Sequence, residues 1–449
     1  MSTRPNEAIL NTGVVNPYAL AELVAGRKIA WSRVPDRTRL LEDILQTPYS
    51  ELFDPQYDSP LYLGLKLAKG GRLEPGRSPL MDVKPSTATN DLQEETDLET
   101  VRQIRDLSRV TGEKDVASLR VERLDVTASG GLRVQIAPPR EKRLQRIARA
   151  ISPEVMETVA GRGRAGQSGD FNPPNATWQD AGTFFNEGAE FFDPIQGAVA
   201  NCYLIAAMAS VAWARPYTIA HRTRATGPNQ PQFTQMIRFF DTEKANASRE
   251  VEVTDLVPVG GWGGEVYCRS SEEGETWPAI YEKAYAKWKT NHAGDKPDIT
   301  ATAWGDPCRA LGELTGLPRE YVATTTMNGT ELWNKVRENS LSRRTFNPVV
   351  AWTYSSGEAS PDKVNYGDAN LVAAHAYSVL GWDYRDGVRY IILRNPWGVT
   401  EASKHNLTGT WFAYDISWWR GIPLATVDGT FGITADAFKK YFACLGIVK

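Results

Sequence analysis

Residues 373–398 read AAHAYSVLGWDYRDGVRYIILRNPWG, and the fold prediction starts from this stretch. Two β-rich runs, Ala374–Leu380 and Val388–Arg394, flank a turn centred near Asp386-Gly387, which is typical of a β-hairpin. His375 lies eleven residues before Asp386, and Asn395 lies nine residues after it. We therefore expect the folded hairpin to bring His375 and Asn395 to the same edge.

This pairing of an asparagine with a histidine indicates catalysis. The asparagine can accept one ring N–H, which fixes the tautomer and leaves the other ring nitrogen free to take a proton from a thiol. A single histidine near a strand is more often structural, so the partner across the hairpin is what favours a catalytic role for His375.

A cysteine suited to this pair lies in residues 201–213, NCYLIAAMASVAW. The segment is apolar nearly all round, which predicts a buried helix closed by Arg215-Pro216, and the turn-like residues 193–197 place Cys202 at its start. Unpaired N–H groups and the helix dipole there would lower the pKa of the thiol. The Cys202 N–H and the Gln196 amide could hold an oxyanion. A lone cysteine on an apolar helix is ordinarily a small core residue.

Four segments resemble, in the same order, signature blocks of the calpain family of cysteine peptidases. Residues 196–207 (QGAVANCYLIAA) look like the family's QGxLGDCWLLAA block. Residues 282–287 (EKAYAK), 375–379 (HAYSV) and 393–398 (LRNPWG) are similar to its EKAYAK, HAYSV and LRNPWG blocks. The resemblance spans about residues 178–449, and its closing part includes Asp428–Phe431 and Phe438–Phe442.

The resemblance implies a residue set and a fold. Cys202 would be the nucleophile, His375 the general base and then acid, Asn395 the residue that orients it, and Gln196 an oxyanion donor, while Trp397 would shield the Asn395–His375 bond from water. The implied fold class is α+β, a papain-like core with a helical lobe bearing the cysteine and a β-rich lobe bearing the histidine and asparagine. An extended peptide or protein substrate would lie between the lobes.

The chain departs from the family's pattern at three places near the cysteine and the histidine. Ala200-Asn201 stands where the family has Gly-Asp, Tyr203 replaces a tryptophan, and Ala374 replaces the glycine before the histidine. No catalytic group is lost, but the Ala374 methyl is expected to narrow or reshape the cleft.

Calcium binding is a further implication of the resemblance. Asp193 matches one ligand position on the cysteine side, and Glu401, Asp428 and Asp415 match positions on the other side. However, Thr430 replaces one carboxylate, and residues 304–306 (WGD) depart from the family's acidic loop. Because a hard cation needs six to eight oxygens, fewer carboxylates weaken a site. The expectation is that no cofactor is required and that calcium is optional.

The length of 449 residues predicts more than one packed unit. Only one of fourteen tryptophans precedes residue 171, which indicates two differently built regions. We expect an N-terminal region of mixed α/β structure over residues 1–137, a linker over 138–174 and the protease domain over 175–449, with lobes of about 175–340 and 341–449. In the N-terminal region, Ala19–Gly26, Asp36–Gln46 and Leu98–Val110 have helical spacing, and Leu119–Val126 with Leu132–Ile136 predicts a hairpin. No chemistry is predicted there.

The linker is basic. Residues 140–164 hold seven basic side chains against three acidic ones. A solvated linker with one short helix is one interpretation. The other is a protease-sensitive junction, cleaved in trans or by the protein itself, since exposed Gly, Arg and Ser segments are easily nicked. The N-terminal region would then regulate, target or assemble the enzyme, or act as a removable prodomain, with a partner that the sequence does not identify.

Composition narrows the partners and the compartment. A net charge of −3 gives no reason to expect nucleic acid as a partner. The sequence contains no apolar run of eighteen residues, so no membrane span is predicted. Four scattered cysteines and the lack of a signal-peptide pattern favour the cytoplasm, or export without a cleaved signal. The predicted function is a calpain-like cysteine endopeptidase. The alternatives are a catalytically silent interaction or structural protein of the same fold, and another papain-fold hydrolase, such as an acyltransferase or amidase.

Overall fold

A computed structural model describes the part of the chain that carries the predicted site. The described residues are 12–14, 16–25, 28–29, 121–126, 132–136, 169–173, 176–186, 188–226, 234–244, 247–413, 421–426 and 428–449. The expected helices over 36–46 and 98–110 and nearly all of the basic linker lie outside these residues.

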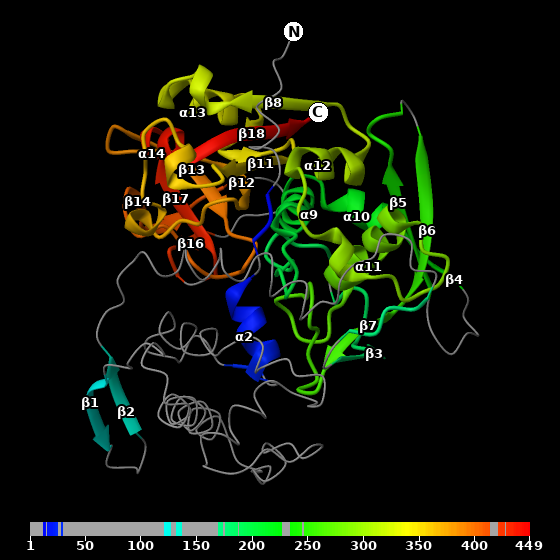
Figure 1. Cartoon of the computed structure of the whole chain (residues 1–449). Helices are drawn as coiled ribbons and strands as arrows, with labels where there is room; N and C mark the ends of the chain where they lie inside the picture. The colour runs from blue at the N-terminus through cyan, green and yellow to red at the C-terminus, as the bar shows by residue number, and fades with distance from the viewer. Residues whose placement is uncertain are drawn as a thin grey trace.

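Helix α9, Cys202–Ala214, lies at the centre of the fold of residues 176–449 (Figure 1). Every residue from Cys202 to Trp213 is buried. Burial on all sides is expected of a helix whose side chains are apolar on all sides. The next helix is α10, Pro216–Arg222, so α9 ends at Ala214 with Arg215 as its C-cap, just before the proline, as expected.

A nine-stranded antiparallel sheet packs against α9 and carries the predicted hairpin. Its main path runs β14-β17-β13-β12-β11-β18-β8. The strands are β8 Arg319–Ala323, β11 Val349–Thr353, β12 Ala376–Arg385, β13 Val388–Arg394, β14 Asn406–Leu407, β17 Thr430–Thr434 and β18 Phe442–Val448, and the short β9 Ser340–Leu341 and β10 Arg344–Thr345 join beside β12.

The β12–β13 hairpin confirms the sequence prediction. Its turn residues Asp386 and Gly387 have φ of 52° and 79°, the left-handed values that a tight two-residue hairpin turn needs. The strands pair from Arg385 with Val388 to Ser378 with Arg394. Because the pairing continues to Ser378 and Arg394, the residues just beyond, His375 and Asn395, lie at one end of the ribbon.

Helices α13, Gly329–Glu338, and α14, Ala435–Tyr441, pack against each other and against β13 of this sheet. Strand β8 and helix α13 both precede residue 340 in the chain, yet Val322 and Leu332 share one buried cluster with Val379 and Leu393 of the hairpin. The short elements on this side are the 3-10 turns η4 Thr324–Thr326, η5 Gly357–Ala359 and η6 Tyr366–Ala369 and the strand pair β15 Gly409–Trp411 and β16 Ile422–Leu424.

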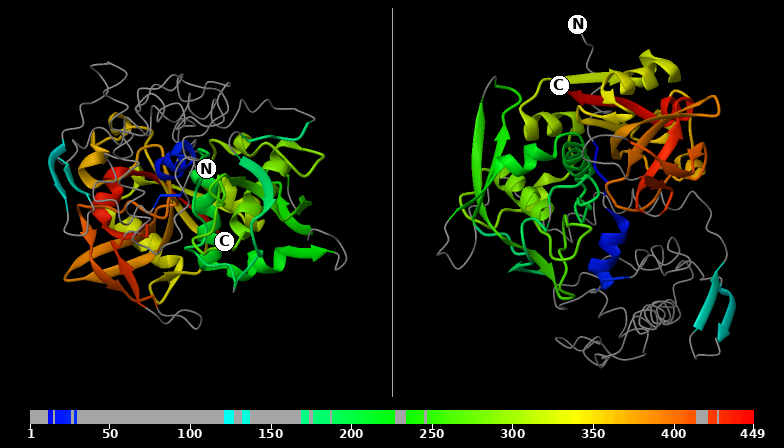
Figure 2. Two further views of the ribbon diagram at one scale, coloured as in Figure 1. Left: turned by 90° about the horizontal axis from the view of Figure 1, so that it is seen from below. Right: turned by 180° about the vertical axis from the view of Figure 1, so that it is seen from behind.

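The other side of α9 is built from helices and two small sheets (Figure 2). Strands β4 Thr223–Thr226, β5 Thr234–Phe240 and β6 Ser248–Thr254 form one sheet, and β3 Ala176–Asp180 pairs with β7 Leu256–Gly260 in the other. Helices α11 Trp277–Thr290 and α12 Pro307–Thr315 and the 3-10 turn η3 Ile299–Thr302 complete this side.

Polar groups join α9 to the large sheet at fixed points. The Ser210 hydroxyl donates to the Val349 carbonyl and accepts from the Val349 N–H, both at 2.8 Å. The Ser378 hydroxyl donates to the Ala206 carbonyl at 2.7 Å. All these groups are buried, so each lost bond would leave an unpaired polar atom. The helix is therefore held in one position along the sheet.

Three elements are described in the N-terminal region. Helix α2, Pro17–Ala25, confirms the expected helix near residue 20, and β1, Val121–Val126, pairs antiparallel with β2, Leu132–Ile136, as predicted. Among the described helices, none is long and apolar enough to cross a membrane.

Candidate active site

Cys202 is the first residue of α9, and its side chain is fully buried. The backbone N–H groups of Val14 and Ala376 and the Thr12 hydroxyl lie within hydrogen-bonding reach of the thiol. The thiol therefore touches the start of β12 on one side and the N-terminal region on the other.

His375 and Asn395 meet as the hairpin predicts. His375 Nε2 lies 2.8 Å from Asn395 Oδ1. The Asn395 amide donates through Nδ2 to the Thr400 carbonyl at 3.0 Å, and this bond directs Oδ1 toward the imidazole. An oxygen at that position requires Nε2 to carry the proton. Nδ1 is buried and has no hydrogen-bond partner in the described part of the chain, so its lone pair is available to accept a proton.

Trp397 covers this pair. Its side chain is buried, its ring centroid lies 4.8 Å from that of His375, and its backbone N–H donates to Asn395 Oδ1 at 3.1 Å. The same tryptophan thus excludes water from the histidine and holds the asparagine oxygen in place.

Gln196 lies beside the cysteine, fully buried. Its Nε2 donates at 2.6 Å to the Val199 carbonyl and at 2.6 Å to the Val14 carbonyl, 182 residues away in the sequence. The predicted oxyanion donor therefore already holds a peptide carbonyl, and that carbonyl belongs to the N-terminal region.

Residues 12–14 lie across the site as an extended strand. The Thr12 N–H donates to the Gly305 carbonyl at 2.9 Å, and the Gly305 N–H returns a bond to the Thr12 carbonyl at 3.0 Å. The Gly13 N–H donates to the Ala374 carbonyl, next to His375, at 3.1 Å. All three residues of the segment are buried.

The chain that follows anchors this strand (Figure 1). Asn16 Oδ1 accepts the N–H of Tyr18 at the start of α2, and Asn16 Nδ2 donates to the Gln196 carbonyl at 2.5 Å. The Tyr18 ring packs edge-on to Trp397, and Glu22 forms a 2.5 Å ion pair with Arg269. The sequence predicts no chemistry in the N-terminal region, and it does not reveal that residues 12–22 contact the catalytic candidates.

The electrostatics of the thiol also differ from the prediction. Burial raises the pKa of Cys202 above its usual range, and burial lowers the pKa of His375 to about 3. Both shifts favour the neutral thiol with the neutral imidazole. The Tyr203 backbone at the helix N-terminus still lowers the thiol pKa, but burial outweighs it because a buried thiolate loses the water that would solvate it.

The Asn201 side chain, next to Cys202 in the sequence, contacts a buried carboxylate. Its amide donates to Glu282 Oε1 at 2.6 Å and to the Thr302 hydroxyl at 3.0 Å. Burial raises the pKa of Glu282 to about 7. An aspartate at position 201 would place a second carboxylate against this buried one, whereas the amide donates a hydrogen bond to it.

The acidic residues fall into separate groups. Asp193, with Glu190 and Glu272, forms a set whose ligand atoms lie within 4.8 Å of one another, and burial raises the pKa of Asp193 to about 7. The Glu401 carboxylate accepts the Gly429 N–H at 2.7 Å, and Asp428 accepts the Thr430 N–H at 2.8 Å. Asp415 lies outside the described residues. Sequence reasoning missed Glu190 and Glu272, which no local motif marks.

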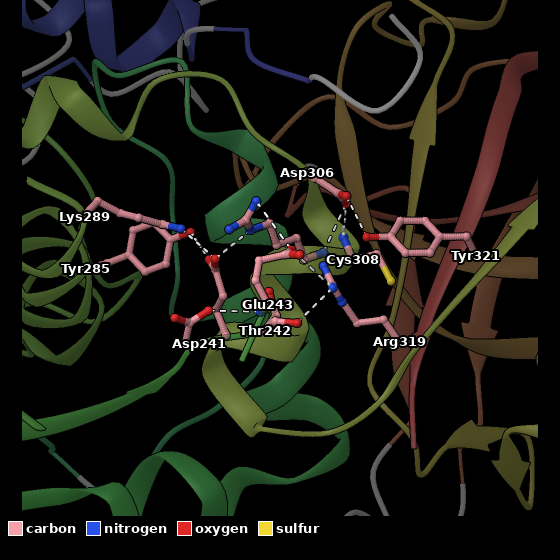
Figure 3. Close-up of polar contacts among 11 residues, drawn as sticks. Asp241, Thr242, Glu243, Tyr285, Lys289, Asp306, Cys308, Arg319 and Tyr321 are labelled. Atoms are coloured by element: carbon pink, nitrogen blue, oxygen red, sulfur yellow. Dashed lines mark hydrogen bonds and ion pairs between the residues drawn. The ribbon is translucent and has the colours of Figure 1, made fainter. Parts of the chain in front are cut away.

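Asp306, the last residue of the loop 304–306, is held by polar contacts with Cys308 and Tyr321 (Figure 3). Asp306 caps α12 by accepting the Cys308 N–H at 2.9 Å and the Arg309 N–H at 3.1 Å, and the Tyr321 hydroxyl donates to its other oxygen at 2.7 Å. This carboxylate is committed to the helix cap, and it fixes the position of the neighbouring Gly305 that pairs with Thr12.

Comparison with known proteins gives a consistent result. The model of the calpain family cysteine proteases matches residues 167–449. A thiol protease of Porphyromonas gingivalis is 25% identical over 96% of this chain and 86% of its own length. The human calpain-1 catalytic subunit is 26% identical over 59% of this chain, and the Caenorhabditis elegans calpain clp-1 is 27% identical over 57%. The chain spans about a third of the length of these two calpains.

Displacing residues 12–14 should make Cys202 more reactive. With the strand in place, the raised pKa keeps the thiol protonated at pH 7 to 8. Returning water would lower that pKa and increase the thiolate fraction. Alkylation by iodoacetamide at pH 7.5, followed by mass spectrometry of the Cys202 peptide, should be at least about tenfold faster in Gly13→Val than in wild type, a factor that one pKa unit supplies.

The control is Gly261→Val, at a glycine whose added Cβ would meet nothing within 4 Å. It should leave the alkylation rate of Cys202 unchanged. Equal rates in wild type and Gly13→Val would show that the strand does not control the thiol.

Proposed function

The chain belongs to the calpain family of cysteine proteases, and on this premise we propose that it is an endopeptidase that hydrolyses proteins with Cys202, His375 and Asn395. The observation that carries the proposal is the 2.8 Å contact between His375 and Asn395, with His375 Nδ1 left unpaired in the described structure and Cys202 at the start of α9.

Each residue has one task in the proposed reaction. His375 Nδ1 takes the thiol proton, and the Cys202 sulfur attacks the scissile carbonyl carbon while the Cys202 N–H and Gln196 Nε2 hold the oxyanion. His375 then gives the proton to the leaving amine, and an acyl thioester remains. Water, deprotonated by the same nitrogen, releases the carboxylic acid and restores the thiol. Asn395 keeps the imidazole oriented throughout.

A papain-like division into two lobes is part of the proposal. One lobe would contain α9, α11, α12 and the two small sheets, and the other the large sheet with its flanking helices. Because β8 and α13 belong to the large sheet and its core, we place the boundary before Arg319 rather than near residue 340.

We also propose that calcium binds the carboxylates of Glu190, Asp193 and Glu272. Three carboxylates this close repel one another when ionised, and a bound Ca²⁺ would supply the positive charge that lets them ionise together. The ion would tie the loop before α9 to the loop before α11. The carboxylates of Glu401 and Asp428 already accept backbone N–H groups, which makes them less available as calcium ligands. Optional binding of calcium therefore fits this chain better than an absolute requirement for it.

The proposal extends to substrate, processing and compartment. The substrate is a protein or peptide, and the enzyme also cuts itself within the basic linker over residues 138–174. All four cysteines are free and buried, which suits a reducing compartment such as the cytoplasm.

Removing each catalytic group should have a distinct kinetic result. Cys202→Ala and His375→Ala should abolish hydrolysis of casein, because the nucleophile or its base is gone. Asn395→Ala should lower kcat by about 10² or more while KM changes little, since only the orientation of the imidazole is lost. Cys444→Ala, at a cysteine in strand β18, is the matched control and should stay active.

Labelling separates an enzyme from a silent protein of the same fold. An epoxysuccinyl peptide should modify Cys202 in the folded wild type and not in His375→Ala. Failure to label Cys202 in wild type and also in Gly13→Val, with and without calcium, would favour the silent alternative.

Calcium should stabilise the cysteine side of the molecule. Adding millimolar Ca²⁺ in place of a chelator should raise the Tm of wild type by several degrees, because the ion binds the folded state. Asp193→Asn should lose most of this shift, and Asp428→Asn should keep it. A shift of equal size in all three proteins would place the ion elsewhere.

Self-cleavage in the linker should give a shortened species that begins between residues 138 and 174. Incubation of the purified full chain followed by intact-mass measurement should reveal it in wild type and not in Cys202→Ala. If both proteins stay full length under conditions where casein is cleaved, processing in the linker is wrong.

A further inference from the structure

The strand over the catalytic residues is bound as an extended peptide substrate would be. Thr12 exchanges two backbone hydrogen bonds with Gly305, and Gly13 donates to Ala374. Backbone bonds of this kind hold an extended peptide in one register and let side-chain pockets determine the sequence preference. Residues 12–14 therefore mark the positions that a substrate takes on both sides of the cut bond.

The bond that faces the sulfur follows from two contacts of the backbone. The Gly13 N–H donates to the carbonyl of Ala374, next to His375, and the Val14 carbonyl accepts a hydrogen bond from Gln196 Nε2. The Gly13–Val14 peptide bond lies between these two contacts. Gly13 therefore occupies the acyl position of the cut.

The walls around Gly13 leave no room for a side chain. A Cβ built on Gly13 would lie 2.6 Å from the Ala200 carbonyl oxygen and 2.8 Å from two carbons of the Trp304 ring. The Ala200 oxygen cannot retreat freely, because it immediately precedes α9 and accepts the Trp304 N–H at 2.9 Å. The backbone and the indole together exclude every residue except glycine.

We propose that the subsite of this enzyme that faces Cys202 accepts only glycine, and that the enzyme cuts its own chain between Gly13 and Val14. The proposal rests on the cysteine endopeptidase function argued above. Trp304 is a specificity residue in it, and Val14 becomes the new N-terminus.

The observed arrangement is the state before the cut. Gln196 Nε2 holds the carbonyl of Val14, one residue past the carbonyl that must be attacked. For reaction, Gln196 releases Val14 and receives the Gly13 oxygen. The Cys202 sulfur then bonds to the Gly13 carbon, the Gly13–Val14 bond breaks, and the Val14 nitrogen takes the proton from His375. Water hydrolyses the thioester and leaves Gly13 with a free carboxylate.

The test is the N-terminus of the incubated full chain, measured by mass spectrometry after labelling of free amines. Wild type should yield a product beginning at Val14, and Cys202→Ala should not. Gly13→Ala should yield at least about tenfold less of it, the effect of one methyl that costs about 1.4 kcal/mol in the transition state. In Gly13→Ala with Trp304→Ala, part of the cleavage should return, because the indole wall is gone.

Two controls keep these variants interpretable. Gly261→Ala adds a methyl where nothing lies within 4 Å, and Phe346→Ala removes another exposed aromatic ring. Both should be cut like wild type. Unimpaired cleavage after residue 13 in Gly13→Ala would overturn the glycine subsite, and a wild-type product beginning at Val15 would overturn the register.

Failure of this proposal is distinguishable from failure of the proposed function. A wild-type protein that cleaves casein, or whose Cys202 reacts with the epoxysuccinyl peptide, yet gives no Val14 terminus, is a cysteine peptidase that does not cut this bond. A wild-type protein that does none of these fails both proposals.

Discussion

The packing of helix α9 against strands β11 and β12 is the constraint on which the site depends. The helix begins at Cys202 and the strand begins one residue after His375, so their relative position determines whether a thiol can meet its base. Buried hydroxyls of Ser210 and Ser378 fix that position from both partners. Because neither bond can be lost without leaving a buried polar group unpaired, the helix cannot slide along the sheet at low cost.

Local sequence was sufficient for the elements that carry the chemistry. The alternation around Asp386-Gly387 predicts the hairpin, and its register brings His375 to Asn395 without further information. The apolar run after Asn201 predicts α9. Position 12, in contrast, pairs with Gly305 across 293 residues, and no local pattern encodes such a contact. For that reason the predicted direction of the shift in the thiol pKa is wrong: burial of Cys202 outweighs its place at the start of the helix.

Three of the positions that depart from the family pattern, Ala200, Asn201 and Ala374, lie close to Cys202 or His375 in the sequence. The carbonyl of Ala200 forms one wall around Gly13, and the carbonyl of Ala374 accepts the Gly13 N–H. Ala374 adopts a φ of 53°, a conformation that favours glycine, so the strain there is retained at the point of contact with the strand. Asn201 donates a hydrogen bond to the buried Glu282 one residue before Cys202. Ala200 and Ala374 thus contact Gly13 through backbone carbonyls, whereas Asn201 acts on a buried carboxylate.

Residues 12–14 belong to the same chain as the site that they cover. This covalent link favours their binding over that of a free substrate, beyond what their contacts alone contribute. Its local concentration is set by the chain that connects it, typically in the millimolar range for short tethers, so a free peptide with equal contacts binds far less often. Cutting at Gly13 removes this advantage for residues on the acyl side, which then leave as a separate peptide. Residues after Val14 stay anchored through Asn16, Tyr18 and Glu22 on the other side of the nucleophile. The proposed cut would therefore open the half of the cleft next to Trp304 while the α2 contacts persist.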